Sequence, residues 1–348
     1  MNITISKPRI VAFEVTHKCQ LNCMHCRASA SEKADREYLT KKQCKQILFS
    51  LAQYNKCVVI LTGGEPMERE DIYELIEYGN NIGHKMALAT CGYLINNESI
   101  ERLKNSGILT LSFSLDGPDA ISHDSFRRVT GAFDITLAAI EKAKSNNIRF
   151  QINTTITNRN VEHVPKIAQL AKKLGAYCFN PFILVPTGRG AEISDEILKP
   201  GRYEMLLYDL AEIKIQNLID VRVTCGPQFS RIMALKNPKI LSKKNNRKGC
   251  MAGGEFAFIS YKGDVQTCGF LNLSAGNLIN NDFNFADIWE NSTFLNNIRD
   301  LSIYKGKCGK CEFVESCGGC RARAYGMTGN YLNSDPICNY QPAQQSRF

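Results

Sequence analysis

The chain carries three closely spaced cysteines in the segment Cys19-Gln20-Leu21-Asn22-Cys23-Met24-His25-Cys26, directly after a short apolar run at residues 10–15. Three thiolates this close together can bind three corners of an iron–sulfur cube and leave the fourth iron without a protein ligand. A structural zinc site needs a fourth ligand, and the nearest candidate, His25, is squeezed between two of the cysteines. The spacing therefore favours an iron–sulfur cluster with one open iron over zinc, or over three cysteines that bind no metal.

The composition is that of a globular protein in a reducing compartment. The chain has 348 residues, 44% of them hydrophobic and 22% charged, and it has no run of about 18 apolar residues that could cross a membrane. Residues 1–10 lack the apolar core of a secretion signal, so the fifteen cysteines indicate bound metal rather than disulfides. We therefore expect a cytoplasmic protein. The formal net charge of +9 suits an anionic substrate, whereas the basic run at residues 243–248 is typical of a solvated linker and not of a nucleic-acid site.

Short apolar runs alternate with longer amphipathic ones between residues 9 and 217. Strands are predicted at residues 10–15, 57–61, 85–89, 109–115, 149–155 and 177–185. Helices are predicted at residues 41–53, 71–82, 98–106, 133–145, 164–174 and 202–216. Six βα units in succession predict an α/β fold with a parallel sheet, as an open partial barrel or as a doubly wound sheet. In both architectures ligands bind at the C-terminal ends of the strands, where the cysteine segment begins.

The composition changes at Cys250. Seven of the fifteen cysteines lie between there and Cys338, in the pattern Cys250-x17-Cys268 and Cys308-x2-Cys311-x5-Cys317-x2-Cys320-x17-Cys338. We therefore predict a barrel over residues 1–217, a bridging segment over 218–249 and a small metal-held domain over 250–348. Residues 256–259 and 262–265 predict a β-hairpin within it. The remaining cysteines are expected to be small buried side chains rather than ligands: Cys44, Cys57, Cys91 and Cys178.

The Cys-x3-Cys-x2-Cys spacing, with His25 beside the third cysteine, resembles the radical S-adenosylmethionine (SAM) superfamily. This resemblance implies a TIM-like partial (β/α)6 barrel in which Cys19, Cys23 and Cys26 bind a catalytic [4Fe-4S] cluster. It further implies that the open iron chelates the amino and carboxylate groups of SAM. An electron from the cluster would then cleave the sulfonium and release a 5′-deoxyadenosyl radical that abstracts hydrogen from the substrate.

Further motifs supply the SAM-binding residues that this resemblance implies, with His25 among them. Leu61-Thr62-Gly63-Gly64-Glu65-Pro66 follows the second strand and resembles the element that holds the methionyl amino group; its two glycines let the backbone approach a ligand closely. In Ser112-Phe113-Ser114-Leu115-Asp116-Gly117-Pro118, strand alternation places Ser114 and Asp116 on one face, available to ribose hydroxyls. Arg127, in a turn-rich loop, is expected to meet the SAM carboxylate, and Asn153 is a further ribose candidate. Ser114 and Arg127 are favoured here, while Asp116 has a structural alternative.

The cysteines from Cys250 onward resemble the SPASM extension of radical SAM enzymes, which carries two auxiliary [4Fe-4S] clusters. The resemblance implies that one cluster is bound completely by Cys308, Cys311, Cys317 and Cys338. It implies that the other is bound by Cys250, Cys268 and Cys320. Its fourth position is then an open iron, a non-cysteine ligand or Cys225. The spacing departs slightly from the family pattern, with two residues rather than three between the fifth and sixth cysteines, and a zinc ribbon is the alternative metal site.

The segments Asn180–Gly190, Cys250–Gly253 and Cys317–Cys338 resemble the tetrapyrrole branch of this group, most of all the heme synthases of the siroheme-dependent pathway. This implies oxidative decarboxylation of two propionates of iron-coproporphyrin III to vinyls, giving heme b. An auxiliary cluster would accept the released electron, and ferredoxin or flavodoxin would be the external electron donor. Three arginines are candidate partners for substrate carboxylates: Arg189, Arg321 and Arg323.

Other functions remain open at this point. Within the tetrapyrrole branch they are siroheme decarboxylation and heme d1 synthesis. A SPASM peptide or sulfatase maturase is a second enzymatic alternative. An electron carrier or a zinc-stabilised binding protein is the non-enzymatic one, although a pure carrier has no need of the Gly63-Gly64 turn beside an open cluster. Neither a nucleic acid nor a membrane is an expected partner.

Overall fold

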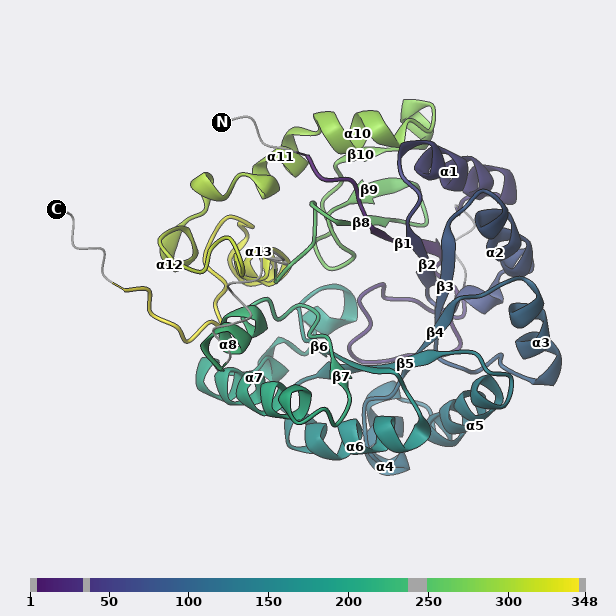
Figure 1. Ribbon diagram of the computed structural model, residues 1–348, viewed down its shortest axis with the longest axis horizontal. Coiled ribbons are helices and arrows are strands. Elements are labelled where there is room, and N and C mark those ends of the chain that lie inside the picture. The colour runs from purple at the N-terminus through teal and green to yellow at the C-terminus, as the bar shows by residue number, and fades with distance from the viewer. Residues whose placement is uncertain (1–4, 34–37, 237–248, 344–348) are drawn as a thin grey trace.

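The computed structural model describes residues 5–33, 38–236 and 249–343 of the chain. Strands lie on the inside of a ring and helices on its outside (Figure 1). The inner strands are β1 (Ile10–Thr16), β2 (Val58–Gly63), β3 (Lys85–Thr90), β4 (Thr110–Ser114), β5 (Phe150–Ile156) and β6 (Cys178–Ile183), with the short β7 (Asp220–Val221) after them. The main outer helices are α1 (Lys41–Tyr54), α2 (Ile72–Asn81), α3 (Asn97–Asn105), α5 (Ala132–Ser145), α6 (Val164–Leu174) and α7 (Pro200–Ile215).

The strands from β1 to β7 pair in parallel and in chain order. This order confirms the partial barrel and excludes a doubly wound sheet, in which the strand order reverses at a switch point. The predicted strands and helices lie within about two residues of the observed bounds. The sequence analysis missed helix α4 (Ala120–Arg127), which begins where the Asp119 carboxylate accepts a hydrogen bond from Ser122 N at 2.9 Å. Arg127 therefore ends a helix and does not lie in a turn-rich loop.

The strands bury one face against the helices and turn a more polar face inward. On β1, Val11, Phe13 and Val15 are fully buried in the main hydrophobic core, and the residues between them point the opposite way. On β5, the alternate residues Gln151 and Asn153 are only half-buried. The inner surface of the barrel therefore offers polar groups at the strand ends, where a ligand can reach them.

The chain beyond residue 250 continues the same sheet. Strand β8 (Phe256–Ile259) pairs in parallel with β1, with Phe256 opposite Ile10, and pairs antiparallel with β9 (Asp264–Gln266). The predicted hairpin is thus confirmed, whereas its pairing with β1 was not predicted. The remaining elements complete the ring in Figure 1: β10 (Gly276–Asn277), α8 (Phe229–Lys236), α10 (Phe285–Asn291), α11 (Thr293–Arg299), α12 (Gly306–Gly309) and α13 (Arg321–Thr328). The linker predicted at residues 243–248 lies outside the described residues.

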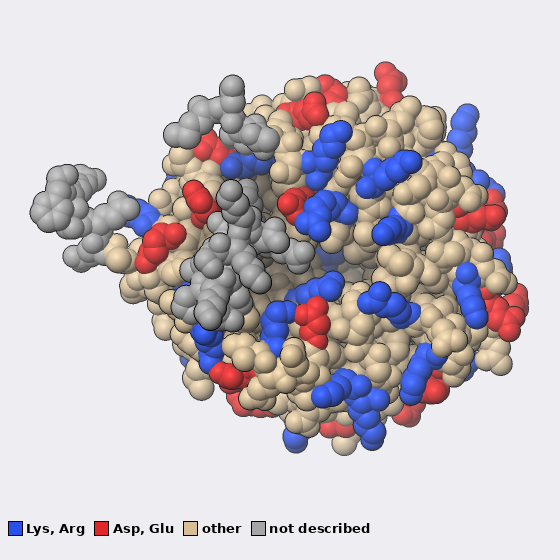
Figure 2. Space-filling model, in the orientation of Figure 1, with Lys and Arg blue, Asp and Glu red and all other residues tan. Residues whose placement is uncertain are grey.

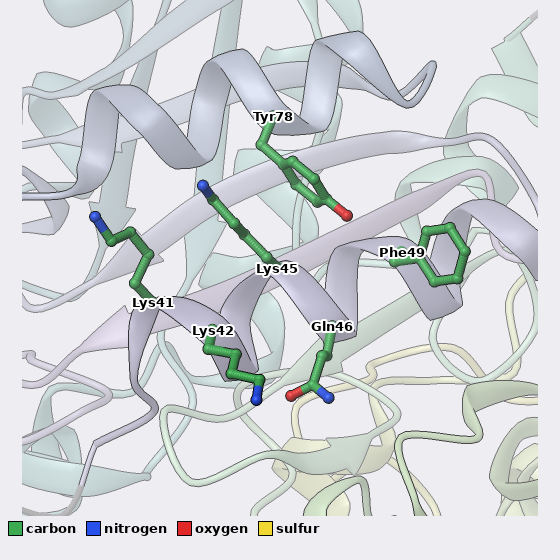
Figure 3. A pocket seen from close by; sticks show the side chains of 6 residues that line it. All are labelled: Lys41, Lys42, Lys45, Gln46, Phe49 and Tyr78. Atoms are coloured by element: carbon green, nitrogen blue, oxygen red, sulfur yellow. The ribbon is translucent and has the colours of Figure 1, made fainter.

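One face of the molecule is hollowed near its centre, and Lys and Arg side chains gather around the hollow (Figure 2). A separate shallow pocket of about 540 Å³ lies on the outer surface of α1 and α2, lined by Lys41, Lys42, Lys45, Gln46, Phe49 and Tyr78 (Figure 3). None of the predicted site residues lines this pocket, and Lys41 and Lys45 both face Glu74. The outer pocket is therefore not the candidate site. Among the described residues, no helix is long and apolar enough to span a membrane.

Candidate functional site

The three cysteines after β1 lie together at the C-terminal end of that strand. Cys19 and Cys23 are buried, Cys26 is half-buried, and the three pack against one another. The loop closes on itself, because Cys19 N donates to Ser31 O at 2.9 Å and Cys26 N donates to Cys23 O at 3.3 Å. The sequence placed the segment at this end of the sheet, and the fold brings the other predicted motifs to the same place.

The segment after β6 braces this loop. Arg189 Nε donates to Cys23 O at 2.9 Å, and Arg189 Nη1 donates to Ala30 O at 2.7 Å. Gly188 has a φ of +56°, and a Cβ there would lie 2.2 Å from Arg27 O, so the close approach of the two segments requires glycine. Arg189 was predicted as a partner for a substrate carboxylate. Two of its nitrogens instead hold the cysteine loop, while Nη2 is buried with no hydrogen-bond partner in the described chain.

The turn of Gly63, Gly64, Glu65 and Pro66 packs directly on the cysteine segment. A Cβ on Gly63 would lie 2.2 Å from Thr16 O, and a Cβ on Gly64 would lie 2.2 Å from Lys18 O. The glycines are therefore needed for the contact between the two loops, a reason that differs from the predicted approach to a ligand. Pro66 then begins a short 3₁₀ helix at residues 66–68.

Glu65 places a buried carboxylate beside the cysteine loop. The side chain is fully buried and accepts hydrogen bonds from Thr90 Oγ1 at 2.9 Å and from Cys91 N at 2.8 Å. Burial raises the pKa of Glu65, because the charged form loses its hydration. A cationic group of a ligand, such as an ammonium, would compensate this carboxylate.

Cys91 joins this site, which the sequence analysis did not foresee. It packs against the Cys19–Cys26 loop, and its thiol contacts the thiol of Cys19 and the carboxylate of Glu65. The contact lowers the pKa of Cys19 and raises that of Cys91. The other three cysteines expected to be buried are so, and burial raises the pKa of Cys44 to about 12, of Cys57 to about 12 and of Cys178 to about 11. The only signal for Cys91 was its position at the end of the third strand.

Asp116 and Arg127 form a buried ion pair against the cysteine loop. Arg127 Nη2 lies 2.6 Å from Asp116 Oδ2, and Arg127 Nη1 donates to Cys23 Sγ at 3.4 Å. Burial opposes the charge of Arg127, yet Asp116 and Cys23 raise its pKa above the ordinary value. Asp116 Oδ1 accepts a further hydrogen bond from Thr155 N at 2.7 Å. Asp116 was expected either to meet ribose hydroxyls or to have a structural role. Its ion pair with Arg127 and its bond to Thr155 N favour the structural role, although Oδ2 has no hydrogen-bond partner in the described chain.

His25 lies on the same side of the loop. Its ring stacks on Phe126 with the centroids 4.4 Å apart, and Nε2 lies 3.8 Å from Asp116 Oδ2. Burial lowers the pKa of His25 well below the ordinary value, and Arg127 and Arg189 lower it further. His25 is therefore a neutral imidazole that can offer or accept a hydrogen bond.

Ser114, the last residue of β4, lies opposite Asn153 in the middle of β5, so the two predicted ribose candidates are neighbours. Asn153 Oδ1 accepts from Gln151 Nε2 at 3.0 Å and from Asn180 Nδ2 at 3.3 Å. Thr224 Oγ1 extends this row by donating to Asn180 Oδ1 at 2.9 Å. The sequence analysis proposed neither Gln151, Asn180 nor Thr224 as a site residue. Gln151 could have been found because it lies two residues before Asn153, on the same face of the strand, whereas Asn180 and Thr224 join the row only through strand pairing.

The C-terminal cysteines form two groups. Cys308, Cys311, Cys317 and Cys338 lie near one another, since the charges of Cys308 and Cys338 raise the pKa of Cys311 and Cys317 after the larger effect of burial. In the second group, Cys225 and Cys268 pack with Cys320. Burial and then the charges of Cys320 and Cys268 raise the pKa of Cys250 to about 12. The fold thus brings together the two sets that the sequence predicted, with Cys225 beside the second.

Arg321 and Arg323 are internal and do not offer free guanidinium groups to a substrate. Arg323 is fully buried, and its Nη2 lies 2.8 Å from Asp335 Oδ2 and 2.9 Å from Cys225 O. Arg321 Nη1 donates to Tyr331 O at 3.0 Å and to Asn333 O at 2.7 Å. The prediction that these two arginines bind substrate carboxylates is therefore wrong, because protein groups already occupy both.

The residues present fit a polar ligand and iron–sulfur clusters. Five buried polar atoms around the first cysteine loop have no hydrogen-bond partner in the described chain: Gln20 Oε1, His25 Nδ1, Asp116 Oδ2, Arg127 Nε and Arg189 Nη2. Such atoms are costly unless a ligand satisfies them. Within the described residues, no three Cys, His, Asp or Glu side chains converge closely enough for one metal ion. The donor chemistry fits iron–sulfur clusters, because cysteine thiolates are the ligands that hold such clusters.

Comparisons with known proteins agree with this arrangement. Residues 13–171 match the model of the radical SAM superfamily, and residues 250–321 match that of an iron-sulfur cluster-binding domain, SPASM. The AdoMet-dependent heme synthase of Methanosarcina barkeri is 42% identical over 97% of this chain and 98% of its own length. The AdoMet-dependent heme synthase of Nitratidesulfovibrio vulgaris is 37% identical, over 97% and 94%. The mycofactocin maturase MftC of Mycobacterium tuberculosis is 32% identical, over 96% and 83%.

Solved structures share the fold at lower identity. Streptococcus suis SuiB bound to its precursor peptide SuiA matches with a TM-score of 0.77 at 20% identity, over 96% of this chain and 76% of SuiB. Native anSMEcpe with bound AdoMet matches with a TM-score of 0.73 at 20% identity, over 95% and 94%. The match to relatives along nearly the whole chain shows that it belongs to the radical SAM superfamily, among the enzymes with a C-terminal SPASM domain.

Proposed function

We propose that this enzyme is a heme synthase that converts two propionates of iron-coproporphyrin III to vinyl groups and so produces heme b. The observation that carries the proposal is the 42% identity to an AdoMet-dependent heme synthase over 98% of that relative's length. A match of this extent covers the barrel and the cysteine-rich region together, so it includes both the radical site and the C-terminal cysteine groups.

The first cysteine loop would hold the catalytic [4Fe-4S] cluster through Cys19, Cys23 and Cys26. SAM would bind its open iron, with the Gly63–Pro66 turn at the ammonium and Arg127 at the carboxylate. Ser114 and Asn153 would meet the ribose, and the neutral ring of His25 would border the site. When bound, SAM and this cluster supply the carbon radical that removes one hydrogen atom from the substrate. Arg189 and Cys91 hold the loop and its surroundings in place, and burial of the cysteines keeps water from the reacting atoms.

The C-terminal cysteines give the released electron a destination. A propionate that loses a hydrogen atom, CO2 and one electron becomes a vinyl group, so each decarboxylation requires a one-electron acceptor. Two auxiliary [4Fe-4S] clusters would fill this role. One would be held by Cys308, Cys311, Cys317 and Cys338, and the other by Cys250, Cys268 and Cys320, with Cys225 as the candidate fourth ligand. A ferredoxin or flavodoxin would reduce the catalytic cluster.

The test is turnover by reconstituted, anaerobically reduced protein with SAM and iron-coproporphyrin III. We expect heme b and 5′-deoxyadenosine, two of the latter for each heme. Cys23→Ala should abolish both products, whereas Cys44→Ala, a buried thiol of α1 outside the site, should retain both. Absence of 5′-deoxyadenosine from the unsubstituted protein would contradict any radical SAM activity.

Two further substrates distinguish the alternatives. Turnover of didecarboxysiroheme in place of iron-coproporphyrin III would favour siroheme-branch chemistry. The identity to a mycofactocin maturase makes peptide maturation the second candidate, and SAM-dependent modification of a mycofactocin precursor peptide would support it. Turnover of either substrate alone would overturn the heme synthase proposal while leaving the radical chemistry intact.

A further inference from the structure

Arg321 places its guanidinium against the sulfur of one predicted cluster ligand. The residue follows Cys320 directly and is 6% exposed. Its Nη2 donates to Cys308 Sγ at 3.4 Å, while Nη1 is held by the carbonyl oxygens of Tyr331 and Asn333. The guanidinium also lies over the ring of Tyr304, 4.6 Å from its centroid. Arg321 Nε also donates to Gly319 O at 3.4 Å, so three carbonyl oxygens and one aromatic ring fix the orientation of the cation toward the sulfur atom.

The positive charge of Arg321 is not compensated by a carboxylate. Its partners are carbonyl oxygens, a sulfur and an aromatic ring, and it forms no ion pair within the described chain. Arg323, two residues later, differs, because both its Nε and its Nη2 bind the carboxylate of Asp335, at 2.9 Å and 2.8 Å. Asp335 also accepts from Cys320 N at 2.9 Å, so this neutral pair adjoins the other cysteine group.

A second cation adds to the field at the same cysteine group. Lys307 Nζ donates to Cys338 O at 2.7 Å. Arg231, which also faces Cys338, is paired with Glu204 at 2.6 Å and adds little net charge. Within the described chain, the group of Cys308, Cys311, Cys317 and Cys338 therefore has two cations that form no ion pair, and the carboxylate of Glu312, which also faces Cys311, is exposed to solvent and screened. The charge of Arg321 also reaches Cys250 of the other group, but its guanidinium hydrogen-bonds Cys308. Arg323, the cation beside Cys320, is neutralised by Asp335.

The backbone is shaped to admit the guanidinium. Gly319 has a φ of +68°, and a Cβ there would lie 2.5 Å from Arg321 Nη2 and 2.9 Å from Cys308 Sγ. Any larger residue would separate the cation from the sulfur. The contact thus depends on glycine at position 319 as well as on arginine at position 321.

We propose that Arg321 raises the reduction potential of the cluster held by Cys308, Cys311, Cys317 and Cys338, so that this cluster is the more oxidising of the two auxiliary clusters. The inference rests on the proposed function, which supplies the clusters. A reduced cluster carries one more negative charge than the oxidised one, so a cation that donates a hydrogen bond to a ligand sulfur stabilises the reduced state. Each decarboxylation would deliver one electron to this cluster, and a soluble one-electron carrier would then reoxidise it.

The experiment compares midpoint potentials in redox titrations monitored by electron paramagnetic resonance. In Arg321→Gln, the potential of this cluster should shift to a more negative value, and in Arg321→Lys, which keeps a charge but not the fork, the shift should be smaller. The Cys19–Cys26 cluster of the same protein is the internal control and should not shift. Arg299→Gln is the matched control, because Arg299 is a half-buried arginine that donates to Gly253 O and hydrogen-bonds no cysteine in the described chain. An unchanged potential in Arg321→Gln at full iron and sulfide content would overturn the inference.

A second measurement keeps arginine in place and so does not depend on how the variants fold. The two auxiliary potentials are measured separately, in Cys250→Ala/Cys268→Ala protein and in Cys311→Ala/Cys338→Ala protein. The inference requires the cluster retained in the first protein to have the higher potential, and the reverse order would overturn it. If the unsubstituted protein lacks an auxiliary cluster altogether, the cofactor assignment itself fails, a result distinct from intact clusters in the wrong order.

Discussion

Replacing Asp116 by Asn should lower the free energy of unfolding by about 3–5 kcal/mol, the usual cost of removing one partner from a buried ion pair. Asp116 is completely buried and lies 2.6 Å from Arg127 Nη2. Asparagine has the same shape and can still accept the hydrogen bond from Thr155 N, now at 2.7 Å. The substitution therefore removes the counter-charge and little else. Among the described residues, the buried guanidinium then keeps its hydrogen bond to Cys23 Sγ but has no ion pair.

A double-mutant cycle separates this charge effect from packing. Arg127→Met leaves the carboxylate of Asp116 buried and uncompensated, so it should cost a similar amount. In Asp116→Asn/Arg127→Met no charge remains, and the double variant should be far more stable than the sum of the two single effects predicts. Urea unfolding of the four metal-free proteins, followed anaerobically by circular dichroism, gives the energies. Additive effects, or a cost below about 1 kcal/mol for Asp116→Asn, would refute the reasoning.

The same four proteins decide how Asp116 acts on SAM. If the carboxylate acts only by holding Arg127, then Arg127→Met should weaken SAM binding and Asp116→Asn should add nothing to that loss. Equilibrium binding of SAM to the reconstituted proteins measures both effects. A further loss of affinity in the double variant would show that Asp116 contacts SAM itself, as the sequence first suggested.

Two further predictions test the surroundings of this pair. Burial, followed by the charge of Arg127, lowers the pKa of His123 to about 4 from an ordinary 6.5, so the unfolded chain takes up this proton first as the pH falls. The resulting loss of stability begins below pH 6.5 and amounts to about 2 kcal/mol between pH 7.5 and 5. Urea unfolding at these two pH values should therefore show a pH dependence of stability that is smaller by this amount in His123→Gln. An equal pH dependence in both proteins would contradict the prediction. Gly64→Ala brings a Cβ to 2.2 Å from Lys18 O and should displace the cysteine loop, so that reconstituted protein loses the iron of one cluster. Gly201→Ala, whose Cβ would meet nothing within 4 Å, is the control and should retain all its iron.

The barrel could be predicted from sequence because the burial of each strand is visible in the hydrophobic pattern of its own residues. Val11, Phe13 and Val15 alternate with residues of the opposite face, and amphipathic runs separate the strands, so period and order together indicate βα units. Helix α4 was not predicted, because it has only eight residues and follows Asp119 in a segment rich in turn-forming residues. The pairing of β8 with β1 joins residues that are 246 positions apart, Ile10 and Phe256, and no local pattern encodes such a pairing.

The cysteines of the site could be predicted from the sequence, whereas the partners of its charged side chains could not. Cysteine spacing is a local property that can be compared with a family pattern, and the fold groups the cysteines in the two sets that the resemblance implied. The partner of an arginine is instead decided by which segment lies opposite. Asp116 and Arg127 are both visible in the sequence, but only the fold shows that they satisfy each other. The same holds for Arg321, which looks like a substrate-binding cation until its carbonyl partners and Cys308 are known.

The three groups of cysteines are connected by arginines that adjoin their ligands in sequence. Arg27 follows Cys26, and its Nη1 donates at 3.5 Å to the carbonyl oxygen of Gly269, which follows Cys268. Arg321 follows Cys320 and touches Cys308. The group with Cys268 and Cys320 thus lies between the other two along this path.

The counter-charges along this path differ at its two ends. Arg27 is paired with Glu14 at 2.8 Å, and Arg323 with Asp335, whereas Arg321 has no carboxylate partner in the described chain. An electron released in the barrel would therefore pass two compensated cations, Arg27 and Arg323, before it reached Arg321. At the radical site, however, Arg189 also forms no ion pair within the described chain, because it donates to the carbonyl oxygens of Cys23 and Ala30. Counter-charges alone therefore do not set the direction of the electron, and the measured potential of the cluster beside Arg321 relative to the catalytic one decides it.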